Sequence, residues 1–161
     1  MATNKIQDLF HVRGLVAVIT GGGSGLGLYA ARALDANGAA AVYIVGRREE
    51  TLKQAASTCS NGSVKYIVGD VSDKDSLQKM VEQIRKEQGF VNFLFANAGI
   101  GGPKDAQEVR KKAEGGGKVG VKEFQTALWQ ADPEEYSKTL HVNVTGTLNQ
   151  SLSAAGAGAL K

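Results

Sequence analysis

The sequence predicts a doubly wound α/β fold, in which helices cover both faces of a parallel sheet. Four short apolar runs rich in β-branched residues alternate with segments of helical periodicity. Each run ends abruptly at a glycine or a small polar residue, and the connections are short enough for right-handed crossovers. The chain of 161 residues is long enough for one domain with a sizeable core. The expected sheet is incomplete, with four predicted strands.

The predicted elements of the first half alternate strictly between strand and helix. Residues 1–14 form an arm without strong periodicity. Ser72, with Asp75 three residues later, is typical of a capping box at the start of the third helix. The strands are predicted at residues 15–20, 41–45, 64–68 and 91–96, and the helices at 25–36, 49–57 and 72–88.

The second half carries weaker signals. Residues 101–120 are rich in glycine and lysine and are predicted to form a mobile surface loop. Acidic residues alternate with the basic ones there, which favours a solvated loop over a binding patch. A short helix is predicted at 121–130, and a longer one from Pro133, capped by Asp132, toward Leu152. The expected boundaries are 1–14 for the arm, 15–153 for the domain and 154–161 for a tail of small residues.

Composition and charge restrict the classes of partner. The net charge of +3 comes from basic residues scattered among acidic ones, so nucleic acid is not an expected partner. The single cysteine, Cys59, cannot form an internal disulfide, and the chain has neither a cleavable signal nor an apolar span of membrane length. We therefore expect a cytoplasmic protein without a membrane partner. His11 and His141 lack a cluster with ligand spacing, so no metal site is expected.

Residues 15–29 predict a phosphate cradle. A buried strand runs into the motif Thr20-Gly21-x-x-x-Gly25-x-Gly27 and then into a helix. Glycine allows the backbone to approach an anionic ligand closely, and the positive end of the helix dipole favours negative charge. By itself such a loop is also compatible with other nucleotide-binding turns or with a purely structural tight turn.

Three later segments lie in register with this loop, each after a predicted strand: Gly46-Arg47-Arg48, Asp70-Val71 and Asn97-Ala98-Gly99. Together with the loop they resemble the short-chain dehydrogenase/reductase family over residues 15–148, and residues 46–52 look most like its fungal oxidoreductase members. The resemblance implies a Rossmann-like fold that binds a nicotinamide dinucleotide. The loop residues expected at the cofactor are Thr20, Gly21, Gly23, Ser24, Gly25, Leu26 and Gly27, of which Gly21, Gly25 and Gly27 cradle the pyrophosphate.

The end of the second strand favours NADP(H) over NAD(H). An acidic residue about twenty positions past the glycines would hydrogen-bond the ribose 2′-hydroxyl of NAD. This chain has Arg47 and Arg48 there instead, and a guanidinium can bind a 2′-phosphate bidentately. The alternative is an ordinary solvated pair of charges that opens a helix.

The other two segments are expected to contact the rest of the cofactor. The resemblance implies that Asp70 hydrogen-bonds the adenine amino group and that Val71 packs near the ring, although Asp70 can also start the turn before the next helix. The segment Asn97-Ala98-Gly99 is expected to brace the sheet and line the ribose. Thr20 is its expected structural partner, because both lie at carboxyl ends of adjacent strands.

The segment from His141 to Gly146 resembles the helix motif whose asparagine belongs to the family's catalytic tetrad. The resemblance implies that Asn143 organises a water linked to a catalytic lysine, whereas the residue alone is typical of a tolerated polar position in a helix. The family's serine, at the end of a fifth strand, and its Tyr-x-x-x-Lys motif should follow this helix. Neither follows it, and no tyrosine of the chain has lysine four positions later.

Three interpretations stay open. In the first, the chain is a shortened NADP(H)-dependent reductase for the carbonyl or alcohol group of a small-molecule substrate, inactive in hydride transfer without the Tyr and Lys. In the second, it binds a nucleotide or a partner without redox chemistry. In the third, it is a shortened family member with different, non-hydride chemistry. In each case the fourth strand is an open sheet edge and a face of the last helix is bare. This predicts a homo-oligomer or a partner chain that covers the edge.

Overall fold

The computed structural model describes residues 11–156 of the chain. Most of the predicted arm, residues 1–10, and the end of the predicted tail, residues 157–161, lie outside the described part. The sequence predicts one domain over residues 15–153, and the described chain forms two compact units. The first unit runs up to Ala98 and resumes at Gly146, and the second is Gly99–Thr145.

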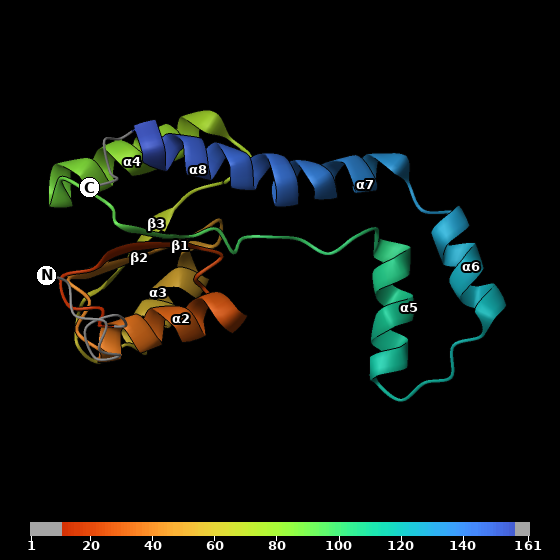
Figure 1. Cartoon of the computed structure of the whole chain (residues 1–161). Coiled ribbons are helices and arrows are strands. Elements are labelled where there is room, and N and C mark those ends of the chain that lie inside the picture. Colours follow the sequence, from red (N-terminus) through yellow and green to blue (C-terminus); the bar gives the residue numbers. More distant parts are fainter. Residues whose placement is uncertain (1–10, 157–161) are drawn as a thin grey trace, which may run out of the picture. The chain divides into compact units, whose positions relative to one another are not determined.

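The first unit is built around a parallel sheet (Figure 1), which confirms the predicted doubly wound α/β fold. The spatial order is β3-β2-β1-β4. The two central strands, β1 and β2, are buried along almost their whole length, as is typical of a parallel sheet covered on both faces. The strands are β1 Val16–Thr20, β2 Ala41–Gly46, β3 Val64–Val68 and β4 Phe93–Phe95.

Helices cover both faces of this sheet (Figure 1), and each face has its own apolar cluster. Side chains alternate along β1, so that Val16 and Val18 pack toward α4 while Ala17 and Ile19 pack toward the other face. Leu77, Met80 and Ile84 of α4 join the first cluster, and Ala31, Leu52 and Ala55 of α2 and α3 join the second. The helices of this unit are α2 Gly25–Ala36, α3 Glu49–Ser57, α4 Lys74–Gln88 and α8 Gly146–Gly156.

Strand β4 runs from Phe93 to Phe95 and is shorter at both ends than the predicted strand at residues 91–96. Asn92 explains the later start. Its side-chain oxygen accepts the Val16 N–H at 2.8 Å, while its own N–H donates to the Val16 carbonyl at 3.1 Å. A side chain thus replaces one backbone acceptor of the ladder, and regular pairing starts one residue later.

The predicted capping box at Ser72 is wrong. Helix α4 begins at Lys74, and its cap is Asp73, whose carboxylate accepts the Asp75 N–H at 3.0 Å. The Ser72 hydroxyl instead donates to Asp70 Oδ1 at 2.6 Å. Because this hydroxyl already serves the preceding turn, the neighbouring aspartate takes over the cap.

The second unit contains α5 Lys104–Glu114, α6 Val121–Trp129, α7 Pro133–Leu140 and a π-helical turn, His141–Thr145. The prediction of a loop throughout residues 101–120 is wrong, because α5 lies within it. Residues 104–114 contain no glycine or proline, and Arg110 pairs with Glu114 at 2.7 Å one turn later. The predicted start of α7 is confirmed: Asp132 caps it by accepting the Glu134 N–H at 2.9 Å.

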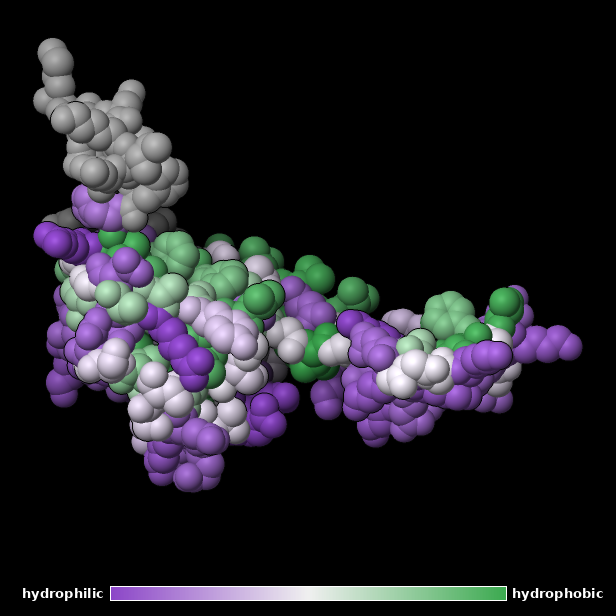
Figure 2. All heavy atoms as spheres, turned by 90° about the horizontal axis from the view of Figure 1, so that it is seen from below, coloured by the Kyte–Doolittle hydropathy of each residue, from purple (hydrophilic) through white to green (hydrophobic). Residues whose placement is uncertain are grey.

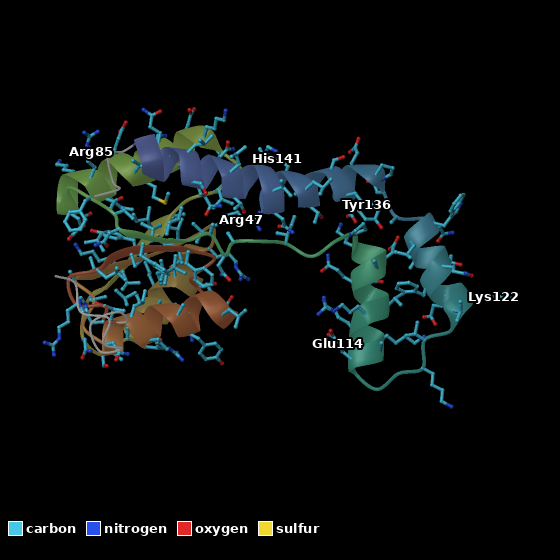
Figure 3. All side chains as sticks on the ribbon, in the orientation of Figure 1. Arg47, Arg85, Glu114, Lys122, Tyr136 and His141 are labelled. Atoms are coloured by element: carbon cyan, nitrogen blue, oxygen red, sulfur yellow. The ribbon has the colours of Figure 1, made fainter. Side chains whose placement is uncertain are left out.

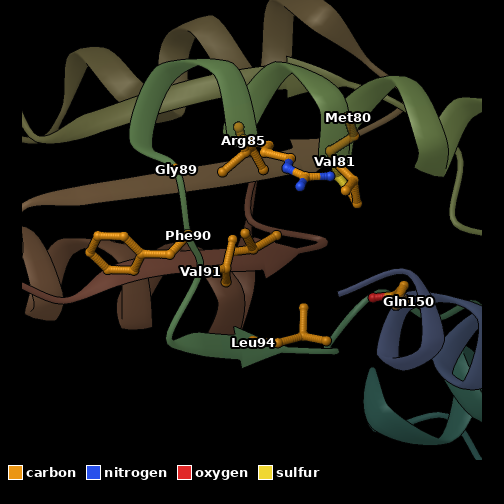
Figure 4. Close-up of a pocket in the computed structure, with 10 residues that line it drawn as sticks. Met80, Val81, Arg85, Gly89, Phe90, Val91, Leu94 and Gln150 are labelled. Carbon is orange, nitrogen blue, oxygen red and sulfur yellow. The ribbon is translucent and has the colours of Figure 1, made fainter. Parts of the chain in front are cut away.

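A small apolar cavity of about 20 Å³ lies between α4, β4 and α8 in the first unit (Figure 4). Val18, Met80, Ile84 and Leu94 are among its lining side chains. Gln150 of α8 also lines it and is only 2% exposed. Its Nε2 donates to the Gly146 carbonyl at 3.0 Å, but its buried Oε1 has no hydrogen-bond partner among residues 11–156. A buried amide oxygen in this state lowers stability.

Replacing this amide should therefore stabilise the chain. We expect Gln150→Leu to raise the free energy of unfolding by about 1–2 kcal/mol, because it removes an unsatisfied polar atom and adds apolar contact. Urea unfolding followed by circular dichroism measures the change. Gln125→Leu on the exposed surface of α6 is the matched control, with an expected change within about 0.5 kcal/mol. A less stable Gln150→Leu chain would mean that the amide oxygen is satisfied in solution.

Candidate nucleotide-binding site

The carboxyl ends of the four parallel strands bring most of the predicted site residues to one edge of the sheet. In spatial order this edge carries Asp70 after β3, Arg47 after β2, the glycine loop after β1 and Asn97 after β4. Figure 3 shows Arg47 near this edge. Such an edge is where open α/β sheets bind their ligands. Gly99 and Asn143 belong instead to the second unit.

Gly21, Gly22 and Gly27 of the glycine loop are packed too tightly for other residues, whereas Gly25 has open space and a φ of +53°. Gly21 has a φ of +67°, and its N–H donates to the Val45 carbonyl at 2.8 Å. A Cβ on Gly27 would lie 2.5 Å from the Gly21 carbonyl oxygen. The sequence prediction passed over Gly22, where a Cβ would lie 2.7 Å from Ile44; its only signal is its place in the run of three glycines.

Helix α2 starts from this loop with an uncompensated positive end. Its N-cap is Ser24, whose side chain makes no capping hydrogen bond, and its first turn contains no acidic residue. The backbone N–H groups and the dipole at this end therefore favour an anion.

Thr20 joins β1 to the segment that follows β4. Its Oγ1 accepts the N–H groups of Asn97 and Ala98, each at 3.1 Å, and its carbonyl accepts the Asn97 Nδ2 at 3.1 Å. Thr20 is fully buried. The predicted structural pairing of Thr20 with Asn97 is confirmed, and it places the Asn97 amide beside the glycine loop, 2.8 Å from where a Cβ on Gly27 would lie.

Arg47 and Arg48 are exposed between β2 and α3. Arg48 is the N-cap residue of α3 and makes no side-chain cap, so it also has the ordinary role of opening a helix. The first turn of α3 touches the glycine loop: a Cβ on Gly23 would lie 3.2 Å from Thr51 Cγ2. The arginines thus lie within a few residues of the place where loop and helix meet.

Asp70 starts the turn that leads into α4. Its Oδ1 accepts the N–H and the hydroxyl of Ser72 at 2.9 and 2.6 Å, and its N–H donates to Ser76 Oγ at 2.9 Å. Val71 is buried beside it. The structural role that the sequence allowed for Asp70 is therefore present, and the contact with adenine stays a prediction.

Asn143 lies in the π-helical turn of the second unit. Its Oδ1 accepts the Ile100 N–H at 2.9 Å and its Nδ2 donates to the Ile100 carbonyl at 3.0 Å. A Cβ on Gly99 would lie 3.2 Å from the Asn143 Oδ1. The amide thus anchors the backbone just after the Asn97-Ala98-Gly99 segment. The sequence predicts an uninterrupted helix here and misses the π turn, a feature that is frequent at functional sites.

Two further properties bear on the kind of site. Within residues 11–156, no three histidine, cysteine or carboxylate side chains are grouped so that they could hold a metal ion. None of the helices in that range combines the length and apolarity that a membrane crossing requires.

Similarity to known proteins extends over most of the chain. The family model for short chain dehydrogenase matches residues 15–114. The short-chain dehydrogenase/reductase PhomF of Diaporthe leptostromiformis is 43% identical over 148 residues, which cover 91% of this chain and 47% of PhomF. VdtF of Byssochlamys spectabilis, also named a short-chain dehydrogenase/reductase, is 48% identical over 97 residues, 60% of this chain and 32% of VdtF. The chain thus spans less than half the length of these relatives.

Solved structures agree with this similarity. A short-chain type dehydrogenase/reductase from Mycobacterium marinum superposes with a TM-score of 0.76 at 26% identity, over 95% of this chain and 53% of that one. NAD⁺-bound xylitol dehydrogenase superposes with a TM-score of 0.70 at 21% identity, over 90% of this chain and 48% of that one. The similarity to xylitol dehydrogenase shows a shared fold.

The Thr20 hydroxyl should be essential to the shape of this edge. Thr20→Val keeps the volume but leaves two backbone N–H groups without their acceptor, so we expect the free energy of unfolding to fall by about 1–3 kcal/mol. Thr20→Ser keeps the acceptor and should cost about 1 kcal/mol or less, for one lost methyl group. Parallel urea titrations compare the two variants. Equal stability of the Val and Ser variants would contradict the bracing role.

Proposed function

This chain belongs to the short-chain dehydrogenase/reductase family, and from that membership we propose that it is the nucleotide-binding half of an oxidoreductase and binds NADP(H). Members of the family bind a nicotinamide cofactor, and the fold of this chain is that of its Rossmann-fold members. The observation that carries the proposal is the arrangement at the carboxyl edge. There a tightly packed glycine loop opens an uncapped helix, with Asn97 fixed beside it by Thr20.

The residues at this edge fit such a cofactor. Because Gly21 and Gly27 have no side chain, the loop can pack against Asn97 and its own backbone at the start of α2, the end of the helix that favours a pyrophosphate. When bound, the cofactor supplies or accepts the hydride. We assign the pyrophosphate to Gly21, Gly25 and Gly27, with Thr20, Gly23, Ser24 and Leu26 around it. We assign the 2′-phosphate to Arg47 and Arg48. The adenine is assigned to Asp70 and Val71, and the ribose to Asn97, Ala98 and Gly99.

The preference for NADP(H) over NAD(H) rests on charge. No carboxylate occupies the two positions after Gly46, where NAD-binding members carry an acid for the ribose hydroxyl. Arg47 and Arg48 are exposed there and can pair with a phosphate dianion.

For the complete reaction we propose reversible hydride transfer between NADP(H) and the carbonyl or alcohol group of a small-molecule substrate. Such chemistry needs a proton donor at the carbonyl oxygen, which the family supplies from its Tyr-x-x-x-Lys motif. No tyrosine of this chain has a lysine four positions later. Asn143 is the single tetrad member that we assign, as a positioning residue. We therefore propose that the chain by itself binds the cofactor and does not turn over.

A second candidate function is partner binding, and the open sheet edge favours it. Strand β4 is an edge strand of the described sheet, and Phe93 on it is 41% exposed. Leu148 and Leu152 of α8 are also exposed, and Figure 2 shows further apolar side chains at the surface in green. Another copy or a partner chain would bury these groups. A cytoplasmic location stays a prediction from the sequence.

Arg47→Ala tests the cofactor assignment. Loss of a charge-assisted contact with phosphate should raise the Kd for NADPH by roughly tenfold or more, while the Kd for NADH changes by less than about threefold. Fluorescence titration of both nucleotides measures this. Arg85→Ala on α4 is the matched control, because Arg85 is exposed elsewhere on the same unit (Figure 3). An equal loss for both nucleotides would defeat the role of Arg47.

Turnover assays distinguish a reductase from a binding protein. The purified chain, mixed with NADPH and a panel of aldehydes and ketones, should show no carbonyl-dependent loss of absorbance at the nicotinamide band, although NADPH still binds. Robust turnover would mean that a proton donor outside the Tyr-x-x-x-Lys motif is present. Activity of Tyr136→Phe would then show whether the exposed tyrosine of α7 is that donor.

A further inference from the structure

The first turn of α3 combines charges of opposite effect on a phosphate ligand. Arg47 and Arg48 are followed directly by Glu49 and Glu50. Acidic side chains stabilise a helix N-terminus because they compensate its dipole. At the same time, two carboxylates next to the arginines would repel a phosphate dianion. The α3 helix therefore needs its acids held where they do not face the ligand.

Lys53 provides the contact that does this. Its Nζ lies 3.1 Å from Glu49 Oε1 and 3.2 Å from Glu50 Oε1, one helical turn later on the same face. Hydrogen bonds raise the pKa of Lys53, the one with Glu49 having the larger effect and the one with Glu50 the smaller, so the ammonium stays charged. One cation thus engages both carboxylates of the turn.

The direction of Glu49 follows from the strand order. Its Oε1 also accepts the Tyr66 hydroxyl at 3.4 Å, and Tyr66 lies on β3. Because the order is β3-β2-β1, this tyrosine lies across β2 from β1 and the glycine loop. Thr51 and Leu52, by contrast, are the residues of the turn that lie against Gly23 of the loop. Lys53 and Tyr66 therefore hold the Glu49 carboxylate on the side away from the loop.

We propose that Lys53 is a specificity-determining positioning residue: by engaging Glu49 and Glu50, it leaves the positive charge of Arg47 and Arg48 available to the 2′-phosphate of NADP(H). This inference rests on the proposed binding of NADP(H). Residues 47–53 carry three cations and two carboxylates, a net charge of +1 that falls to zero without Lys53. Exposed ion pairs contribute little to stability, so Lys53 can be replaced without unfolding the chain.

The test compares nucleotide affinities at low ionic strength. Lys53→Met should raise the Kd for NADPH roughly three- to tenfold and leave the Kd for NADH within about twofold, because only NADPH carries the extra dianion. The triple variant Lys53→Met, Glu49→Gln, Glu50→Gln should restore the NADPH affinity. Lys79→Met, which removes an exposed lysine from α4, controls for net charge and should change neither Kd. High salt should shrink the effect of Lys53→Met.

Each outcome decides a separate question. If the unaltered chain binds NADPH no better than NADH, the proposed function fails. If the unaltered chain prefers NADPH and Lys53→Met keeps the same ratio of the two Kd values, the role of Lys53 is overturned. Weaker NADH binding by Glu49→Gln would also overturn it, because Glu49 would then face the ribose. If the triple variant does not regain NADPH affinity, Lys53 does not act on nucleotide binding by engaging Glu49 and Glu50.

Discussion

The hydrogen bonds from Asn97 and Ala98 to the buried Thr20 hydroxyl are the interaction on which the nucleotide-binding edge depends. Regular pairing between β1 and β4 covers only Ala17 to Ile19 and Phe93 to Phe95, so the threonine side chain continues the link beyond the ladder. The same link sets the Asn97 amide against Gly27. Strand ends, glycine loop and the start of α2 are therefore positioned together, and glycine is required where they crowd.

Electrostatics at this edge follow a common pattern, in which acidic groups are engaged while positive groups remain exposed. Ser72 donates to Asp70, and Lys53 engages Glu49 and Glu50. The start of α2 has neither a side-chain cap nor an acid in its first turn. Arg47 and Arg48 extend into solvent. Such an arrangement suits a ligand with several negative charges, which is the physical basis of the proposal for NADP(H).

Most residues assigned to the cofactor belong to the first compact unit, among them the glycine loop, Arg47, Asp70 and Asn97. Gly99 and Asn143, the assigned tetrad residue, belong to the second. Within the second unit, both polar atoms of the Asn143 amide bind the backbone of Ile100. This is a structural role that the chain supports without the family's tyrosine and lysine, and it gives a reason for an asparagine at the π turn.

The sequence by itself determined the α/β class, the alternation of elements and the residues at the carboxyl edge, because periodicity and glycine placement are local properties. The helices at residues 25–36 and 49–57 match α2 and α3 to the residue. Tertiary structure decided what depends on a distant partner: Asn92 delays the start of β4 by hydrogen-bonding to Val16, 76 residues away. The structure also shows that Ser72 bonds the neighbouring Asp70 instead of capping α4. It also decided that Glu49 turns toward Tyr66 of β3, since this contact joins elements whose separation along the chain carries no periodic signal. The pairs of Lys53 with Glu49 and Glu50, by contrast, follow from helical spacing.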